Sequence, residues 1–455
     1  MANATHDDDV LNITALSDLP SIGRQGFGLV LLLGPNNSTG PLIQAFSGAQ
    51  AAVAAQVANN ITIAQRDALT RAFSQAIKPR TILVCRRPAD VAQVTDFLIV
   101  SSTAGNYTIA LAGTPFTLTV IAQTAAQIAT ALAALIDASP LYDAAVVTAT
   151  TVRVTASTAG GEFGSATVSP ALNITTTVST SAVNVGTALD AARNERDDFY
   201  GVCLDSRTDL DNGRLAEWAE LNLRLAGAQT SSAAVKGVGA DWTTVHATNP
   251  YLLVGFRASD ASYAMFAWLT YTLSCNLDRQ TTQWSLKTIS GEIADVLTDT
   301  EKGNLRAKNV NYYLTLKGVP CWREGKTRRG QYADQRTTLD WTLARSKEAL
   351  ATLLLNASNR NEKIPFDDEG IATCQAVVFS VLLQGEAAGH FAPSSSRVRF
   401  TPYAELNLDD RNSRRFVYRY GGVFGGAVET FDGEGYFSAD PAQLDSIFAV
   451  ADETN

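Results

Sequence analysis

The chain has 455 residues, which is enough for two to four domains. Hydrophobic residues make up 46% and charged residues 18%, a composition typical of soluble globular proteins. The net charge of −9 disfavours indiscriminate binding to nucleic acid or to anionic lipid. Because the apolar runs break before about 18 residues, we expect no transmembrane helix. The acidic N-terminus has no apolar signal core, so we expect an intracellular product.

Residues 25–97 and 184–278 alternate between strand-like and helix-like segments. Strands are expected at 27–34, 81–87 and 199–205, and helices at 65–76, before 198 and at 212–227. The segment 259–275 is apolar nearly all round, so we expect a helix buried between layers. This alternation predicts an α/β domain in which helices cover a sheet.

A low-charge module interrupts this domain at residues 98–183. Thr, Ala, Val and Ser dominate it. Two strands are expected around the turn in 106–121, then a helix at 124–138, then one strand in each of 144–157 and 166–179. We interpret the module as an inserted β-rich surface domain that the host fold tolerates.

Residues 279–425 form a further predicted domain. Thr298 and Glu301 have the spacing of a helix-capping box. Strands are expected on both sides of Gly318, with another at 331–334. Two long helices follow, the second introduced by Pro365 and Asp367 and closed by Gly385. On the first helix, one apolar face holds Trp341, Leu350, Leu353 and Leu354.

Charge is distributed unevenly along the chain. Between Lys302 and Lys347 there are eleven Lys and Arg residues against three acidic ones. No Lys or Arg follows Arg419, whereas the last residues and those before Arg24 are acidic. A basic middle with acidic ends allows a homo-oligomer whose termini dock onto neighbours. Solvated surface charge is the alternative interpretation.

The segment GVPCWREGKT (318–327) resembles a phosphate-binding loop, but it fails the test in detail. The position where the motif needs glycine is Pro320, which has no N–H to donate. No helix is expected to start at Lys326, so no helix N-terminus would face an anion. We therefore predict a β-hairpin with a basic turn.

Other chemical motifs are equally weak, and we assign no catalytic, cofactor-binding or metal-binding residue. The five cysteines are odd in number and lie in apolar settings, which predicts reduced, buried thiols. DLDNG (209–213) fits a helix N-terminus better than a calcium loop. His246 near Asp241 lacks any accompanying nucleophile motif. A hydrolase that uses paired carboxylates stays open, because one sequence cannot show which carboxylates meet in space.

Several segments resemble contractile-tail sheath proteins of bacteriophages, in a branch long catalogued as of unknown function. They include QWSLKTISGEIADVLTDTEKGNLRAKNVNYYLTLKG, DDFYGVCLDSRTDLDNGRLAEWAE, DWTLARSKEALATLLLN, KIPFDDEGIATCQAVV and GGVFGGAVETFDGEG. Together with REGKTRRGQYAD and DDRNSRR they cover about residues 190–435 in order.

The resemblance implies a structural, non-enzymatic role without cofactor, nucleic acid or membrane as partner. Sheath subunits of this family form sixfold rings around a tail tube and contract, which drives the tube through the host envelope. Expected partners are further sheath subunits, the tube protein, and baseplate and tail terminator proteins. The expected location is the phage tail of the virion, after assembly in the host cytoplasm.

The resemblance also implies extended arms that add strands to neighbouring subunits. Here the arms would be residues 1–24 and 426–455. Candidate contacts of the N-terminal arm are Asp7, Asp8, Asp9, Val10, Leu11 and Ile13. Candidate contacts of the C-terminal arm are Glu429, Phe431, Asp432, Tyr436 and Phe437. Candidate contacts of the basic hairpin with a neighbour or the tube are Arg323, Lys326, Arg328 and Arg329.

Two other function classes remain as alternatives. One is a virion adhesin that binds glycans through the 98–183 module. The other is a nucleotide-dependent enzyme centred on 325–327.

Overall fold

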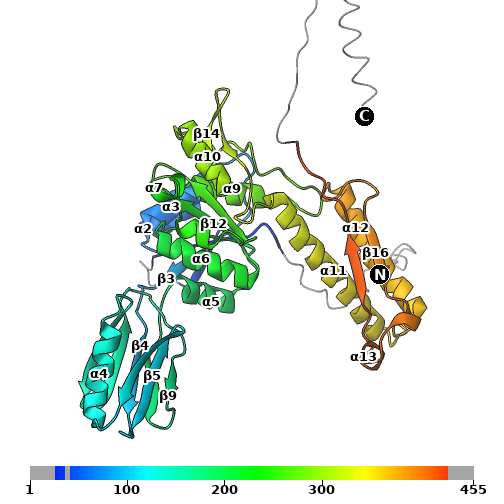
Figure 1. The fold of residues 1–455 in the computed structure, drawn as a ribbon. Coiled ribbons are helices and arrows are strands. Elements are labelled where there is room, and N and C mark those ends of the chain that lie inside the picture. Colours follow the sequence, from blue (N-terminus) through cyan, green and yellow to red (C-terminus); the bar gives the residue numbers. More distant parts are fainter. Residues whose placement is uncertain (1–25, 36–40, 429–455) are drawn as a thin grey trace, which may run out of the picture.

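A computed structural model describes residues 26–35 and 41–428. Its centre is an eight-stranded sheet in the order β15-β14-β13-β12-β11-β1-β3-β2 (Figure 1). The six inner strands are parallel, and β2 and β15 pair antiparallel at the two edges. The strands are β1 (Val30–Pro35), β2 (Ile43–Phe46), β3 (Ile82–Arg87), β11 (Gly201–Leu204), β12 (Leu225–Thr230), β13 (Leu252–Phe256), β14 (Asn311–Leu316) and β15 (Val319–Arg323).

Helices cover both faces of this sheet, as the alternating sequence predicts. One core cluster contains side chains of α2 (Ala49–Val57), α3 (Ile63–Phe73) and α9 (Ala264–Leu273). The opposite cluster contains side chains of α5 (Val185–Glu195), α6 (Asp209–Asn222) and α10 (Asp299–Ala307), near the short helices α7 (Ala233–Lys236) and α8 (Trp242–Val245). Because both faces are covered, inner strands such as β1, β11 and β13 are apolar runs. The prediction of a buried helix within 259–275 is confirmed by α9.

Two predicted helix starts are confirmed by the structure. Thr298 and Glu301 form the expected capping box at α10. DLDNG opens α6, although Thr208 is the N-cap and its hydroxyl accepts the Asp211 N–H.

The inserted module consists of two sheets and one helix, and it stands apart from the central sheet (Figure 1). Helix α4 (Ala125–Asp137) packs on the sheet β10-β4-β8-β7, and the second sheet is β6-β5-β9. The strands are β4 (Val94–Ile99), β5 (Gly105–Leu111), β6 (Thr114–Val120), β7 (Tyr142–Thr148), β8 (Thr151–Ala156), β9 (Thr167–Ser169) and β10 (Ile174–Thr180).

Three expectations for this module need correction. Residues 144–157 fold as the β7–β8 hairpin and not as one strand. The turn between Thr148 and Thr151 was missed because it contains no glycine, proline or other typical turn residue. Residues 166–179 are split into β9 and β10 at Pro170, which cannot donate to a sheet ladder. The boundary at 97/98 cuts through β4, which pairs inside the module with β8 and β10.

A long helix connects the centre to a C-terminal unit (Figure 1). This helix is α11 (Ala333–Asn359); its first turns carry Trp341 into the central core, and its later turns pack on α12 (Asp368–Ala387). The hairpin of β16 (Arg397–Phe400) and β17 (Tyr418–Gly421) lies against α12, with a 3-10 turn (Tyr403–Glu405) and α13 (Leu408–Asn412) in its connection.

Details of these helices differ from the expectation. Asp367 caps α12 by accepting the Gly370 N–H, as its position predicts. Gly385 does not close the helix, which continues to Ala387. A glycine is required at this position because the rings of Phe391 and Trp341 leave no space for a Cβ. Residues 331–334 form no strand: Tyr332 makes one isolated bridge with Lys326, and α11 begins at Ala333.

Helix α12 bears on the membrane prediction. Contrary to the expectation from run lengths, it is the one helix in the described part of the chain that is long and apolar enough to cross a membrane. Its Ile371, Cys374 and Val378 side chains are buried in a cluster with Phe400 of β16. One face of α12 is therefore buried within the fold, whereas Phe379 and Leu383 are exposed.

Candidate assembly surface

The C-terminal unit exposes a two-stranded sheet. The sequence RVRF alternates, so Val398 and Phe400 face α12 while Arg397 and Arg399 face solvent. Strand β17 pairs only with β16 among the described strands, so the hairpin presents an outer edge on each side. Such edges hold unpaired N–H and C=O groups that can receive another strand.

The edge strand β15 of the central sheet is different, because the preceding chain covers it. Leu286 N donates to Trp322 O at 2.7 Å, and Trp322 N donates to Lys287 O at 3.0 Å. The β16–β17 hairpin is therefore the better candidate for strand addition.

The solvent face of the hairpin is basic. Arg399 lies directly opposite Arg419, and Arg397 lies opposite Gly421. Like charges directly opposite each other destabilise a strand pair. No ion pair within the described residues joins these three arginines to a carboxylate. The face is thus suited to an acidic partner.

Beside the hairpin lies a groove with a volume of about 640 Å³, which we call the aromatic groove. Its aromatic rings are stacked in two pairs, Phe366 with Phe416 at 4.8 Å and Phe400 with Tyr418 at 4.5 Å. Leu350 and Leu354 of α11 form an apolar wall, and Lys363 and Arg414 contribute positive charge.

The predicted arm contacts cannot be located in the fold. The N-terminal positions Asp7, Asp8, Asp9, Val10, Leu11 and Ile13 lie outside the described residues. The C-terminal positions Glu429, Phe431, Asp432, Tyr436 and Phe437 do so as well.

The four predicted basic contacts have different environments. Arg329 is exposed, and Arg323 is half-buried at the end of β15. Lys326 is half-buried, 3.8 Å from Glu324 and over the ring of Tyr332. Arg328 is 2% exposed, and its guanidinium donates to the Thr243 carbonyl at 2.8 and 3.1 Å. Burial lowers the pKa of Arg328 to about 10. The side chain of Arg328 therefore belongs to the interior of the subunit.

The geometry also explains why GVPCWREGKT is no phosphate loop. Its glycine–lysine–threonine end follows β15, and the hairpin turn itself lies at Lys317 and Gly318. The backbone N–H of Lys326 donates to Asn311 Oδ1, and that of Thr327 donates to Gln331 O. The next three N–H groups also have backbone acceptors. Between Lys326 and Gly330 a phosphate would therefore find no free backbone N–H group, and the next helix, α11, begins only at Ala333.

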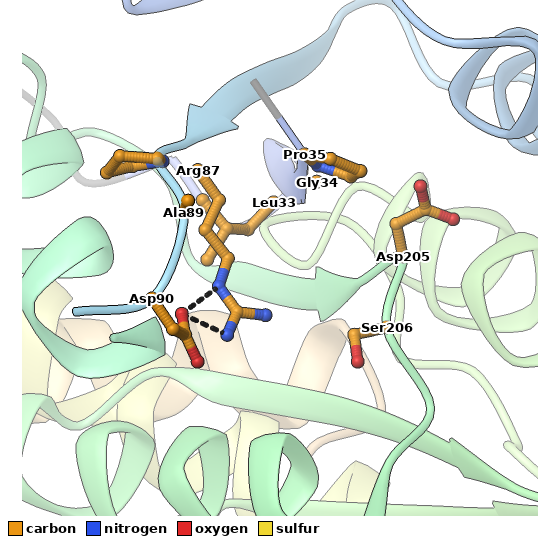
Figure 2. Close-up of a pocket in the computed structure, with 9 residues that line it drawn as sticks. Leu33, Gly34, Pro35, Arg87, Ala89, Asp90, Asp205 and Ser206 are labelled. Carbon is orange, nitrogen blue, oxygen red and sulfur yellow. Dashed lines mark hydrogen bonds and ion pairs between the residues drawn. The ribbon is translucent and has the colours of Figure 1, made fainter. Parts of the chain in front are cut away.

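A second polar site lies at the carboxyl ends of β1, β3 and β11. Ligands of doubly wound sheets bind at such a point, where the strand order reverses. Here a cavity of about 440 Å³ is lined by Gly34, Arg87, Asp90 and Asp205 (Figure 2). The Arg87 guanidinium is held by Asp90 at 2.6 Å and by Asp211 at 2.8 Å. Its charge is thus neutralised within the fold, at the stem of the inserted module.

The cysteines and histidines of the described chain are placed for packing and not for chemistry. All five cysteines are buried and free, as predicted, and burial raises the pKa of Cys85 to about 12. His390 is 1% exposed, lies between Thr338 and the Leu277 carbonyl, and stacks on Trp341. Burial lowers the pKa of His246. Within residues 26–35 and 41–428, no cluster of three His, Cys, Asp or Glu residues could hold a metal ion.

The inserted module offers little for glycan recognition. Its five aromatic residues are Phe97, Tyr107, Phe116, Tyr142 and Phe163. Four are buried, and Phe116 packs against their cluster. The edge strand β10 exposes mainly Thr and Ser, which provide no ring for sugar stacking.

Sequence reasoning missed the paired arginines and the aromatic groove. The alternation in RVRF and in VYRY was a usable signal for two half-exposed strands. Nothing local indicates that Arg399 meets Arg419, since that contact depends on strand register.

Comparison with known proteins was made at three levels. No family model matches the chain, and no curated protein matches it. Among solved structures, a chain of the anti-feeding prophage helical sheath in its contracted state is similar, with 10% identity and a TM-score of 0.53. The match covers 93% of this chain and 96% of the other. A chain of the anti-feeding prophage baseplate in its contracted state matches with 8% identity and a TM-score of 0.55, over 92% and 96%. The chain therefore has a fold seen in contractile sheath and baseplate assemblies.

Proposed function

We propose that the chain is the structural subunit of a phage contractile tail sheath. The observation that carries this proposal is the likeness in fold to a helical sheath chain over nearly the whole length of both. Subunits would stack as sixfold rings around a tail tube and contract to drive the tube through the host envelope. The energy would be stored in the extended assembly, so the role is structural and not enzymatic.

The β16–β17 hairpin is the proposed site at which neighbours are linked. Its two outer edges can each receive a strand from a terminal arm of another subunit. The acidic ends of the chain complement the exposed Arg397, Arg399 and Arg419. Arms that cross to a neighbour would keep subunits connected while their bodies slide and rotate.

Other partners follow from this role. The tube protein would lie inside the rings, with baseplate and tail terminator proteins at the two ends of the sheath. Arg329 and the partly exposed Lys326 and Arg323 form a proposed contact with a neighbour or with the tube. The proposed location is the tail of the virion, after assembly in the host cytoplasm.

Negative-stain electron microscopy of the purified protein, alone and with its tube protein, tests the proposal. We expect hollow cylinders or stacked rings; monomers under all conditions would contradict a sheath role. Deletion of residues 1–20 should abolish polymerisation and leave a monomer with unchanged circular dichroism. Continued polymerisation of that variant would show that the N-terminal arm does not link subunits.

A further inference from the structure

Another cavity lies at the carboxyl ends of three neighbouring strands, β11, β12 and β13. We call this cavity of about 400 Å³ the strand-end recess; it is lined by Asp205, Arg207, Thr208, Ser231, Asp260 and Tyr263. Doubly wound sheets bind their ligands outside the carboxyl ends of the strands. Asp205 also lines the neighbouring cavity in Figure 2, where its side chain lies apart from the Arg87 guanidinium. The recess is therefore a preformed concave site at a position suited to a small ligand.

The guanidinium of Arg207 has no partner in the described part of the chain. Its Nη1 atom is buried without an acceptor, and no carboxylate forms an ion pair with it there. The guanidinium stacks over the Tyr263 ring, 4.9 Å from the ring centre. Arg257 at the same sheet edge is different, because it donates to the carboxylates of Glu292 and Asp295. Since buried polar groups in folded proteins are nearly always hydrogen-bonded, Arg207 lacks an acceptor that a ligand can supply.

Asp205 lacks the opposite kind of partner. Its backbone N–H donates to Leu33 O at 2.8 Å, but within the described residues its carboxylate accepts no hydrogen bond. The Gln65 amide lies beside it, since a Cβ at Gly34 would be 2.5 Å from Gln65 Nε2 and 3.1 Å from Asp205 Cβ. Gln65 is 2% exposed, and its Nε2 has no acceptor in the same part of the chain. Burial raises the pKa of Asp205 and lowers that of Arg207, so neither charge is well solvated.

These unpaired groups define the ligand by its charges. Arg207 and Asp205 line the same recess, yet no ion pair joins them within the described chain. A simple anion would leave Asp205 unpaired and would be repelled by Asp260, whereas a simple cation would leave Arg207 unpaired. A carboxylate suits the planar guanidinium, which can donate two parallel hydrogen bonds, and an ammonium group suits the Asp205 carboxylate. A zwitterion that carries both groups a few atoms apart pairs every one of these charges.

We propose that the strand-end recess binds a free α-amino acid, with its carboxylate on Arg207 and its ammonium group on Asp205. Both residues lie in the turn from β11 into α6, so the ligand braces this turn and stabilises the folded subunit. All contacts come from one subunit. The inference is therefore independent of assembly and goes beyond the proposed sheath role.

Thermal unfolding of the purified full-length subunit tests this proposal. The Tm is measured at constant ionic strength with each of the common L-α-amino acids at about 10 mM, and calorimetry gives the Kd of those that raise it. We expect at least one amino acid to raise the Tm. Its N-acetyl derivative and its carboxamide each lack one charge, so each should bind about tenfold or more weakly. No stabilisation by any amino acid, or equal binding of either derivative, would overturn the proposal.

Variants of the recess locate the binding. Arg207→Gln and Asp205→Asn should each raise the Kd about tenfold or more. Asp209→Asn is the matched control, because Asp209 is exposed nearby in α6 but does not line the recess; its Kd should be unchanged. Amino-acid binding that survives both recess substitutions would place the ligand elsewhere and refute the inference.

The same variants give a readout without ligand. Because each substitution removes an unpaired, poorly solvated charge, neither should lower the Tm of the free subunit. A lowered Tm in both variants would show that Arg207 and Asp205 are paired within the subunit, and that finding would overturn the inference as well.

Discussion

Reversing the charge of Arg419 should have opposite effects on the isolated subunit and on its assembly. In the subunit, Arg419 faces Arg399 across the strand pair. Like charges opposite each other cost about 0.2–1 kcal/mol, and an exposed ion pair contributes a similar amount. Arg419→Glu replaces the repulsion by an attraction, so the free energy of unfolding should rise by about 0.5–2 kcal/mol. In the assembly, the same change removes a positive charge that we expect to meet an acidic arm.

Two measurements on the same variant check this reasoning. Urea unfolding of the unassembled subunit, followed by fluorescence, gives the stability change. Sedimentation over a concentration series gives the protein concentration at which assembly begins. For Arg419→Glu this concentration should be several-fold higher than for the wild type. Arg397→Glu is the control: Arg397 faces Gly421, so the assembly defect should remain and the gain in stability should be absent. A less stable subunit with Arg419→Glu, or unchanged assembly in both variants, would refute the argument.

Three further predictions concern packing, pH and nucleotide binding. Gly385→Ala should lower the free energy of unfolding by about 1–3 kcal/mol, because its Cβ would lie 2.9 Å from a buried aromatic ring; Gly303→Ala, where α10 has open space, should raise it by about 0.5–1 kcal/mol in the same urea assay. The ion pair with Lys236 lowers the pKa of Glu301 to about 2, so its stabilising effect is present above the unfolded value near 4.5 and is lost as pH falls toward 2. The difference in Tm between the wild type and Glu301→Gln should therefore shrink from pH 6 to pH 3, and a constant difference would contradict this. Calorimetry with ATP should show no binding by the wild type or by Lys326→Ala; saturable binding that Lys326→Ala removes would restore the phosphate-loop interpretation.

Elements with a strong local pattern could be predicted from the sequence. Strands such as 27–34 and 81–87 are continuous apolar runs because both faces of the sheet are covered. The capping box of Thr298 and Glu301 predicted the start of helix α10. The scarcity of charged residues in the inserted module indicated a separate unit, and this unit has its own hydrophobic core.

Features that depend on distant contacts could not be predicted. Gly385 was interpreted as a helix end, since glycine often follows a last turn. In the fold it is a close-packing position in the last turn of α12, and the two rings that require it belong to Phe391 and Trp341, outside this helix. Arg328 was interpreted as part of a basic surface, yet its guanidinium is buried against the Thr243 carbonyl, 85 residues away.

The core depends on local sequence patterns, whereas the assembly surface depends on contacts between residues that are distant in the sequence. Burial in the core repeats along a strand or helix, so one segment of sequence carries the signal by itself. The basic face of the hairpin is made by two strands that are joined through a 3-10 turn and α13, and its meaning lies in the pairing of Arg399 with Arg419. That pairing disfavours the isolated hairpin, and no ion pair within the described residues joins either arginine to a carboxylate. A feature that costs stability in the subunit and has an acidic counterpart at both ends of the same sequence is best explained by contact with another copy.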